Sequence, residues 1–428
     1  MGQARCIITG EVITEENNSR AHVIPSALGG RLKPWDILSK DGNTLLGDNI
    51  DLPLIEAFQS LMTLLDGSRD RGTNRPVRMT DESGRVVVIK FGEPLKLAQT
   101  AYSENQTANG LEVRIDARNL KELRTQLGRV KAKIPTFDID EAMKHAVVKR
   151  TWPDGVLRGQ LQIGPGVVFP AIFVAASIFA AHHGLDPHPA LRSYVDEFDP
   201  ETPILPPDTF FFMPDWPGFK APGEVTHIVV LCADSAARRM LVCVELFNVM
   251  TVGVVLPYAG DVDRTESYAV DLLTGAQAPV TVDTTALKGM PWGATHQNGD
   301  TALQRHVTGR LKKLLVTAKE RAFQAQIKAL TDRVFGTNPN APLTPDGLVA
   351  AVKELVDFTL HDWERPLTTV ADRENGAAAF DQLCRQFEQL FHPAGRPIFR
   401  SKIAPEQARL QAAIDQARAA EASTKAGL

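Results

Sequence analysis

The sequence predicts an α+β fold built from three successive regions. Residues 1–66 combine two β-prone segments, a histidine and an Asn-containing turn with a helical pattern, and this order is typical of a ββα unit. Residues 67–300 predict an α+β middle domain, and residues 301–428 predict a helical region. A chain of 428 residues exceeds the length at which one hydrophobic core usually keeps growing, so several domains are expected.

The elements of the N-terminal region follow from local composition. Arg5–Thr9 and Arg20–Ile24 are short β-prone segments, and a Gly/Pro turn follows the second one. From about Leu52 apolar side chains recur at helical spacing and give the helix one apolar face. The residues of this face are Leu54, Ile55, Phe58, Leu61, Met62 and Leu65.

Longer elements are expected in the rest of the chain. The predicted helices are a charged one over Asp116–Lys133, a buried one over Pro170–His183 and a basic one over residues 301–335. The predicted strands are the hairpin Val77–Thr80 with Arg85–Phe91, the pair Val225–Leu231 with Arg239–Phe247, and Thr251–Pro257.

Composition points to a cytoplasmic protein without a membrane partner. A content of 43% hydrophobic and 23% charged residues is that of an ordinary soluble protein. The four cysteines are far apart and form no CxxC pair, which argues against a disulfide framework and fits a reducing compartment. The most apolar window, Val167–Ala181, is too short for a membrane span and suits a buried helix.

The formal charge of −4 gives no overall basic field, so contact with nucleic acid must come from local patches. The densest cationic stretch is residues 301–335, with eight Lys or Arg against two acidic residues. Arg310, Lys312 and Lys313 are its candidate DNA contacts. The alternative is a helix whose charged face meets only solvent.

A series of residues between positions 6 and 51 forms an ordered motif. These residues are Cys6, Gly10, His22, Ile24, Pro25, Leu28, Gly29, Gly30, Ile37, Leu38, Asn43, Gly47, Ile50 and Asp51. The series resembles the HNH endonuclease superfamily, in the branch whose pattern runs CxxCG, EHIIP, LGG, ILCxxCN, G and ID. The resemblance is confined to the N-terminal region.

This resemblance implies a ββα-metal core that hydrolyses DNA phosphodiester bonds with one metal ion. His22 matches the general base that takes a proton from the attacking water. Asn43 matches the Asn that ends the metal loop and orients the base or the metal, and Asp51 matches a late acidic position that offers an oxygen ligand. The implied cofactor is Mg²⁺, with Mn²⁺ as a substitute. Bacterial or mobile-element defence is one setting for such an enzyme.

The chain departs from the family pattern at four positions. Thr9, Ser39 and Gly42 stand where the family has zinc cysteines, so no structural zinc is expected. Ala21 replaces the acid that usually precedes the histidine, which removes a candidate metal ligand. The alternative function is therefore a catalytically degenerate HNH-like domain that serves as a nucleic-acid-binding or protein-interaction module.

Cations around the motif are the remaining candidates. Arg20, Arg31 and Lys33 lie near His22 in the sequence and are candidate phosphate contacts. The same stretch can also be a tight turn without a binding role. Asn43 can be a simple turn former, and Asp51 can cap the helix that follows. DNA is the expected partner, and a homo-oligomer is compatible with the sequence.

Overall fold

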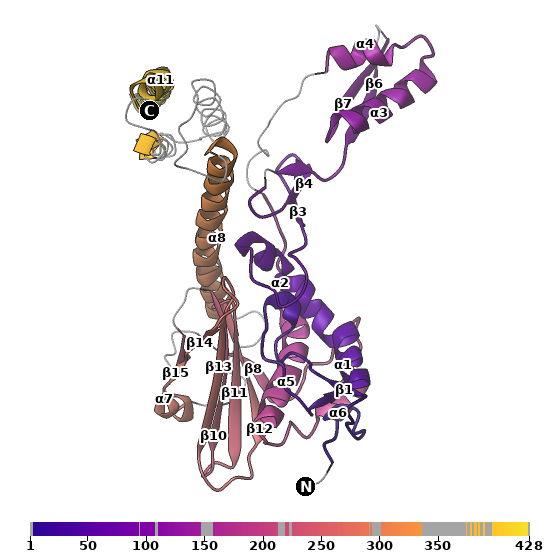
Figure 1. Ribbon diagram of the computed structural model, residues 1–428, viewed down its shortest axis with the longest axis vertical. Helices are drawn as coiled ribbons and strands as arrows, with labels where there is room; N and C mark the ends of the chain where they lie inside the picture. The colour runs from indigo at the N-terminus through magenta and orange to yellow at the C-terminus, as the bar shows by residue number, and fades with distance from the viewer. Residues whose placement is uncertain are drawn as a thin grey trace. The chain divides into compact units, whose positions relative to one another are not determined.

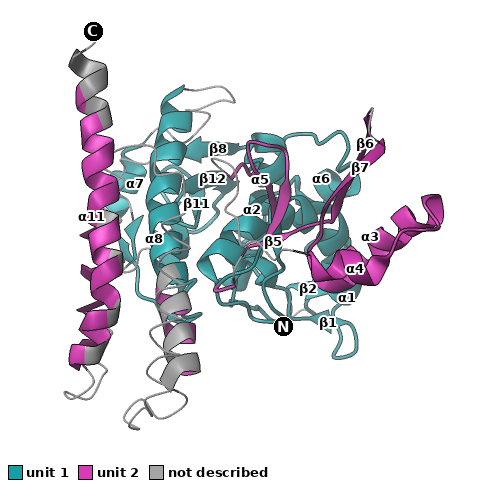
Figure 2. Ribbon diagram, turned by 90° about the horizontal axis from the view of Figure 1, so that it is seen from above, with its two compact units in different colours: residues 1–77, 89–91, 160–322 teal, residues 78–88, 92–159, 323–428 magenta. Residues whose placement is uncertain are grey.

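The computed structural model describes most of the chain. The described residues are 3–93, 95–107, 110–146, 157–212, 219–221, 225–290, 292, 301–335, 396–426 and scattered positions from 374 to 389. They form helices and antiparallel sheets, which confirms the expected α+β class. They divide into two compact units (Figure 2). The first unit holds residues 1–77, 89–91 and 160–322, and the second holds 78–88, 92–159 and 323–428.

The first unit combines parts of all three predicted regions, so it does not follow the predicted boundaries at 66 and 300. Phe58, Phe173 and Val307 come from the three regions and belong to one cluster of buried side chains. An apolar face must be buried against another element. Here the elements of the N-terminal region complete their core with elements that follow more than a hundred positions later.

A six-stranded antiparallel sheet forms the centre of the first unit (Figure 1). Its strand order is β14–β13–β10–β11–β12–β8. The strands are β8 (Thr209–Phe212), β10 (Thr226–Asp234), β11 (Arg239–Leu246), β12 (Met250–Pro257), β13 (Arg264–Asp271) and β14 (Gln277–Ala278). In β10 and in β11 all residues but one are buried. The predicted strand pair and the strand after it are confirmed.

Both faces of this sheet are covered. Val229 and Leu231 of β10 point into the larger core, which includes helix α5 (Pro165–His182). Val230 points into a second core on the other face, with Leu287 of helix α7 (Thr284–Lys288). Strands that are buried on both faces carry continuous apolar runs, which is why β10 and β11 show no alternation of apolar and polar residues.

Helix α5 is the predicted buried helix. Among the described helices it alone is long and apolar enough, by length and composition, to cross a membrane, but 78% of its residues are buried inside the protein. It contacts α2 and strands β8, β11 and β12. A helix that is apolar on all sides suits a position inside the core of a protein.

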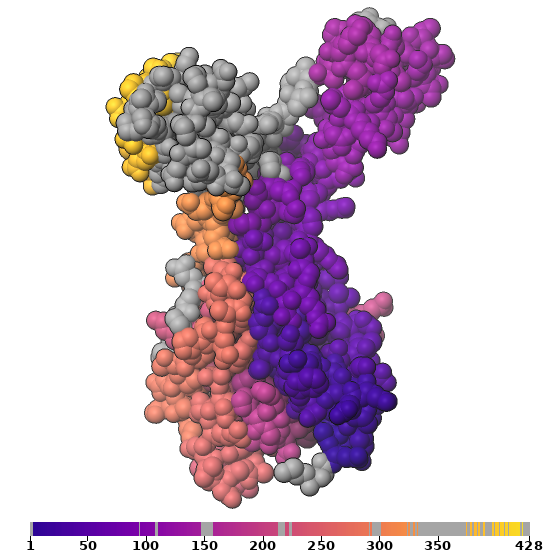
Figure 3. Space-filling view, in the orientation of Figure 1, coloured from indigo at the N-terminus to yellow at the C-terminus, as the bar shows by residue number. Residues whose placement is uncertain are grey.

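The helical part of the N-terminal segment begins earlier than expected. It runs through α1 (Lys40–Leu46), the π turn η2 (Gly47–Asp51) and α2 (Leu52–Leu65). The hydroxyl of Ser39 caps α1 by accepting the backbone N–H of Gly42 at 3.1 Å. The predicted apolar face of α2 is buried, apart from the half-buried Ile55. In the space-filling view the indigo and violet N-terminal residues form one surface with the pink residues of the same unit (Figure 3).

The two predicted N-terminal strands are wrong. Within residues 3–51 the strands are β1 (Asn18–Ser19) and β2 (Leu38–Ser39), which pair with each other. Residues 7–9 form a turn, because Gly10 adopts a φ of +76° and its N–H bonds the carbonyl of Cys6 at 2.9 Å. Residues 20–24 hold no strand. Tertiary contacts have overridden the weak β-propensity of both segments.

The first unit also contains several short elements. They are η1 (Ser26–Leu28), α6 (Leu191–Asp196), β9 (Phe219–Lys220) and β15 (Thr281–Val282). The predicted basic helix is confirmed as α8 (Thr301–Phe335). Its residues up to Ala322 belong to the first unit, and the remaining ones belong to the second unit.

The second unit has smaller sheets. Strands β3 (Val77–Thr80), β4 (Val86–Ile89) and β5 (Lys96–Leu97) form one sheet, whose outermost residues Val77 and Ile89 fall in the first unit. The hairpin of β6 (Ala101–Thr107) and β7 (Gly110–Asp116) forms another. The helices among the described residues of this unit are α3 (Leu120–Lys133), α4 (Ile139–Lys144) and α11 (Arg396–Ala426). The predicted charged helix thus begins four residues later than expected.

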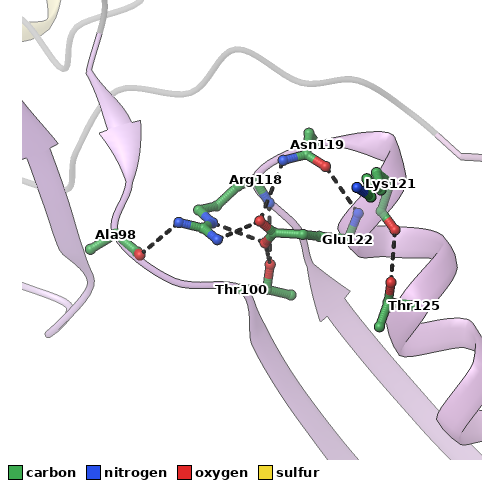
Figure 4. Close-up of polar contacts among 7 residues, drawn as sticks. All are labelled: Ala98, Thr100, Arg118, Asn119, Lys121, Glu122 and Thr125. Atoms are coloured by element: carbon green, nitrogen blue, oxygen red, sulfur yellow. Dashed lines mark hydrogen bonds and ion pairs between the residues drawn. The ribbon is translucent and has the colours of Figure 1, made fainter.

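A polar cluster fixes the start of α3 (Figure 4). Arg118 donates to Glu122 Oε2 at 2.9 Å and to the carbonyl of Ala98 at 3.2 Å. Asn119 caps the helix by accepting the N–H of Glu122 at 2.9 Å. The hydrogen bonds from Arg118 and Thr100 lower the pKa of Glu122 to about 2. The cluster lies at the start of a helix, where an anionic side chain also interacts favourably with the helix dipole.

Candidate functional site

A tight turn brings the motif histidine beside two predicted cations. The N–H of Val23 bonds the carbonyl of Leu32 at 3.0 Å, so the segments on either side of the turn run past each other. A Cβ at Gly30 would lie 1.8 Å from the carbonyl oxygen of Ile24, and Gly29 has a φ of +91°. Both positions therefore need glycine. The Gly-Gly pair closes the turn that carries Arg31 and Lys33 back to His22.

A buried histidine of the sheet contacts the backbone of this turn. His227 of β10 lies 2.8 Å from the carbonyl of Leu28 through Nε2 and accepts the N–H of Phe247 at 3.2 Å through Nδ1. Burial lowers the pKa of His227 to about 4. The neutral ring has one donor and one acceptor, and both are used here.

The polar side chains beside the turn differ in burial from their apolar neighbours. Ala21 and Val23 are buried, whereas His22 between them is only partly buried. Arg31 and Lys33 are also partly exposed. The two apolar neighbours of His22 belong to the core, whereas the polar side chains stay partly open to solvent.

Asp70 is the centre of the polar cluster. Its Oδ2 lies 3.1 Å from His22 Nε2 and accepts Lys33 Nζ at 2.8 Å. Its Oδ1 accepts Arg31 Nη1 at 3.1 Å. The side chains of His22 and Asp70 are 12% and 16% exposed, so solvent still reaches the pair. We call these four residues the His22 cluster.

The segment that carries Asp70 is fixed by backbone and side-chain contacts. Helix α2 ends at Asp66 with a left-handed φ of +50°. The N–H of Ser68 then bonds the carbonyl of Leu272 at 2.6 Å. Arg31 Nη2 donates to the Ser68 hydroxyl at 2.7 Å and to the carbonyl of Arg69 at 3.1 Å. Asp70 is therefore placed by the same arginine that it binds.

The surroundings of His22, burial above all, favour the neutral form of its ring. Burial lowers the pKa of His22 below its ordinary value, and the hydrogen bond with Asp70 opposes part of this shift. The hydrogen bond from Lys33 holds the pKa of Asp70 well below its usual range. Lys33 and the exposed Arg71 also lower the pKa of His22 through their positive charges. Near pH 7 the ring of His22 is neutral while the carboxylate is ionised.

This arrangement has the parts of a general base beside an anion site. If the Nε2 hydrogen of His22 faces Asp70, Nδ1 holds a lone pair that can accept a proton. Arg31, Lys33 and Arg71 provide three positive charges against the one negative charge of Asp70. The excess of positive charge attracts an anion such as a phosphate.

Asn43 is not a member of the His22 cluster. It is exposed on α1, not in the expected turn, because Ser39 starts a helix at that point. Within the part of the chain that the structure describes, no hydrogen bond joins the Asn43 side chain to His22 or to Asp51.

Asp51 also lies outside the His22 cluster. It does not cap α2, because the chain is already helical in front of it. Burial raises the pKa of Asp51 to about 7. Its carboxyl group makes no hydrogen bond or ion pair with another described residue.

The residues around His22 do not fit a divalent cation as they stand. Both oxygens of Asp70 are occupied by cationic donors, and Ala21 offers no ligand. Among the described residues no group of three or more His, Cys, Asp or Glu side chains lies close enough to hold a metal ion. Mg²⁺ and Mn²⁺ stay a prediction that rests on the resemblance.

The predicted nucleic-acid contacts have different surroundings. Arg20 is exposed, and its guanidinium carbon lies 4.6 Å from the ring centre of Trp35. Arg310 forms an ion pair of 3.0 Å with Glu245 and donates to the carbonyl of Asn248. Lys312 and Lys313 are exposed on α8.

The four positions of the expected zinc cysteines lie together. The N–H of Thr9 donates to Cys6 Sγ at 3.4 Å. A hydrogen bond with Ser39 also contributes, and it lowers the pKa of the thiol. A Cβ at Gly42 would lie 2.8 Å from Cys6 Sγ and 3.3 Å from Ser39 Oγ. We call these residues the Cys6 cluster. Its members contact one another through packing and hydrogen bonds.

Sequence reasoning missed Asp70, Arg71 and Trp35. Asp70 lies 48 positions after His22, beyond the motif, in a stretch that reads only as a basic turn. Trp35 lies inside the motif but matches none of its positions. No periodic pattern in the sequence marked Trp35, whose exposure only the structure shows.

The chain was also compared with known proteins. Comparisons with protein-family models, with curated proteins and with solved structures find no match. Any assignment of function therefore depends on the residues and geometry of the chain itself.

Proposed function

We propose that the chain carries an HNH-like core whose His22 cluster hydrolyses phosphodiester bonds of DNA. The observation that carries this proposal is a neutral histidine, held by a carboxylate, among cations on a partly exposed surface. The meeting of Cys6, Thr9, Ser39 and Gly42 supports the HNH-like core, because these are the positions that hold zinc in the family.

In the proposed reaction a water oxygen attacks phosphorus and loses its proton to His22 Nδ1. The new phosphorus–oxygen bond forms as the bond to the leaving oxygen breaks, and solvent protonates the leaving oxygen. Arg31, Lys33 and Arg71 stabilise the negative charge that develops on the phosphate. Asp70 orients the ring and stabilises the cationic form of His22. No step is assigned to a metal ion.

A second candidate function is binding of DNA without cleavage. Two observations favour it: Ala21 supplies no acid, and both oxygens of Asp70 already have cationic partners. In this case the same cations contact phosphate, and His22 has no chemical role.

A nicking assay separates the two functions. Plasmid DNA is incubated with the full chain in Mg²⁺, in Mn²⁺ and in a chelator. We expect cleavage by the unmodified chain and a loss of about 10²–10⁴-fold in rate for His22→Ala, as is usual when a general base is removed. The matched control is His145→Ala, since His145 also pairs with a carboxylate, Glu141, but is exposed on α4. Thermal unfolding checks that both variants are folded.

The pH profile tests the role of Asp70. Its hydrogen bond and charge raise the pKa of His22. In Asp70→Asn the pKa of His22 should therefore fall, and the acid limb of the rate profile should move to lower pH. Equal cleavage by the unmodified chain and His22→Ala would overturn the proposal. DNA binding without cleavage under any of these conditions would favour the second candidate.

A further inference from the structure

An exposed tryptophan lies close to the His22 cluster. The side chain of Trp35 is 55% exposed, although the preceding Pro34 is buried. It is the one aromatic residue among the strongly exposed large apolar side chains of the described chain. Arg20 covers one face of the indole, with its guanidinium carbon 4.6 Å from the ring centre. The pair therefore presents an aromatic surface next to a positive charge.

The path of the chain places this pair beside the His22 cluster. Arg20 is two residues before His22, and Trp35 is two residues after Lys33. Residues two positions apart in a chain have Cα atoms at most about 7 Å apart, so each member of the pair lies close to a residue of the His22 cluster. The two segments are joined beyond the pair by the Asn18 amide, which donates to Asp36 Oδ1 at 2.5 Å. They are joined again, on the side of the turn, by the hydrogen bond of Val23 with Leu32.

Stacking is the chemistry that such a surface offers. Every nucleobase has a flat π face, and aromatic side chains bind it with little regard to sequence. The bases of a duplex are already stacked on each other, so only an unpaired base can use the indole. The cations of the His22 cluster lie within reach of the phosphate of a nucleotide held in this way.

We propose that Trp35, backed by Arg20, stacks an unpaired base and directs the His22 cluster to single-stranded DNA. This inference rests on the proposed function, because it names the form of DNA that the site takes. The alternative is an exposed side chain that packs against Arg20 and binds no ligand.

Binding of labelled oligonucleotides by the full chain tests the proposal. Single-stranded dT20, a duplex of equal length and an abasic strand of equal length are compared, and a denaturing gel confirms that each strand stays intact during the measurement. Trp35→Ala should weaken binding of dT20 by about tenfold to a hundredfold. Trp35→Phe should retain most of the affinity. The matched control is Ile204→Ala, which removes an apolar side chain of similar exposure, 57%, in the same unit.

Two further measurements separate stacking from charge. Trp35→Ala should leave the slope of log affinity against log salt unchanged, whereas Lys33→Gln should reduce it by about one. The abasic strand should bind the unmodified chain and Trp35→Ala equally. An unchanged affinity of Trp35→Ala for dT20, or an equal loss for strand and duplex, would overturn the proposal. The hydrolase proposal fails separately, if the chain binds single strands through Trp35 but does not cleave them in a way that depends on His22.

Discussion

The Cys6 cluster and the His22 cluster lie in the same N-terminal segment, and they have opposite characters. Cys6 is fully buried, and its neighbours Ser39 and Gly42 are buried as well. Burial alone would raise the pKa of the Cys6 thiol, but hydrogen bonds with Ser39 and Thr9 lower it below the ordinary value. The His22 cluster instead holds four side chains that can carry charge, each still reached by solvent.

The comparison separates side chains that hold chain segments together from side chains that can act on a ligand. A structural zinc holds chain segments together, and a hydroxyl, a thiol and a close glycine can join the same segments in a chain with a large core. Charged groups that act on a ligand cannot be replaced in this way. If the His22 cluster is functional, it must stay solvent-accessible, and the following changes test this difference.

The largest expected effect comes from Gly30→Ala. The new Cβ would meet the carbonyl oxygen of Ile24 at 1.8 Å, so the backbone of the turn must move. We expect a loss of at least about 4 kcal/mol in the free energy of unfolding, measured by urea denaturation. The matched control is Gly47→Ala, where a Cβ meets nothing within 4 Å and the helical backbone suits alanine. A loss below about 1 kcal/mol for Gly30→Ala would contradict the need for glycine at the turn.

The second change restores the cysteines that the family pattern contains. The triple variant Thr9→Cys, Ser39→Cys, Gly42→Cys should bind one zinc ion per chain, because these positions surround Cys6. At a hundredfold excess over the dissociation constant, zinc should stabilise it by about 3 kcal/mol. Metal analysis and thermal unfolding measure the two effects. Adding Cys6→Ser to the triple variant is the control and should weaken zinc binding. A triple variant that folds but holds no zinc would count against the HNH-like arrangement.

The third change asks whether the partly buried Asp51 is a packing residue or a metal ligand. Its pKa of about 7 is above the ordinary value of 3.8, so the folded chain binds more protons than the unfolded chain between these two values. Stability should therefore fall as the pH rises from 4 to 7, and Asp51→Asn should remove this loss. The full pKa difference corresponds to about 4 kcal/mol at pH 8. Because solvent still reaches the partly buried carboxyl, we expect Asp51→Asn to be more stable than the unmodified chain by about half of this.

Adding Mg²⁺ completes this test. A cation bound to Asp51 would stabilise the unmodified chain at pH 8 and have no such effect on Asp51→Asn. If Mg²⁺ shifts the unfolding temperature of both proteins equally, Asp51 is not the ligand that the resemblance implies. Asp48→Asn is the control, because Asp48 lies in the same π turn but is exposed.

The sequence by itself determined the elements whose pattern is local and strong. The apolar spacing of α2, the all-apolar α5 and the continuous apolar runs of β10 and β11 each identify their element because burial fixes the pattern of side chains. The motif also led to His22, Arg31 and Lys33, which the structure brings together. Short segments such as Arg5–Thr9 were misjudged because their propensity is weaker than the contacts that bend them.

Only the tertiary structure decided which groups meet. Asp70 reaches His22 because helix α2 ends at Asp66 and the next residues attach to Leu272, a contact between positions more than two hundred apart in the chain. Arg310, predicted to meet DNA, instead meets Glu245 of β11. Such pairs leave no periodic trace in a sequence, because a single ion pair constrains two side chains and not a pattern. The boundary between regions was decided in the same way, since buried side chains from all three predicted regions share one core.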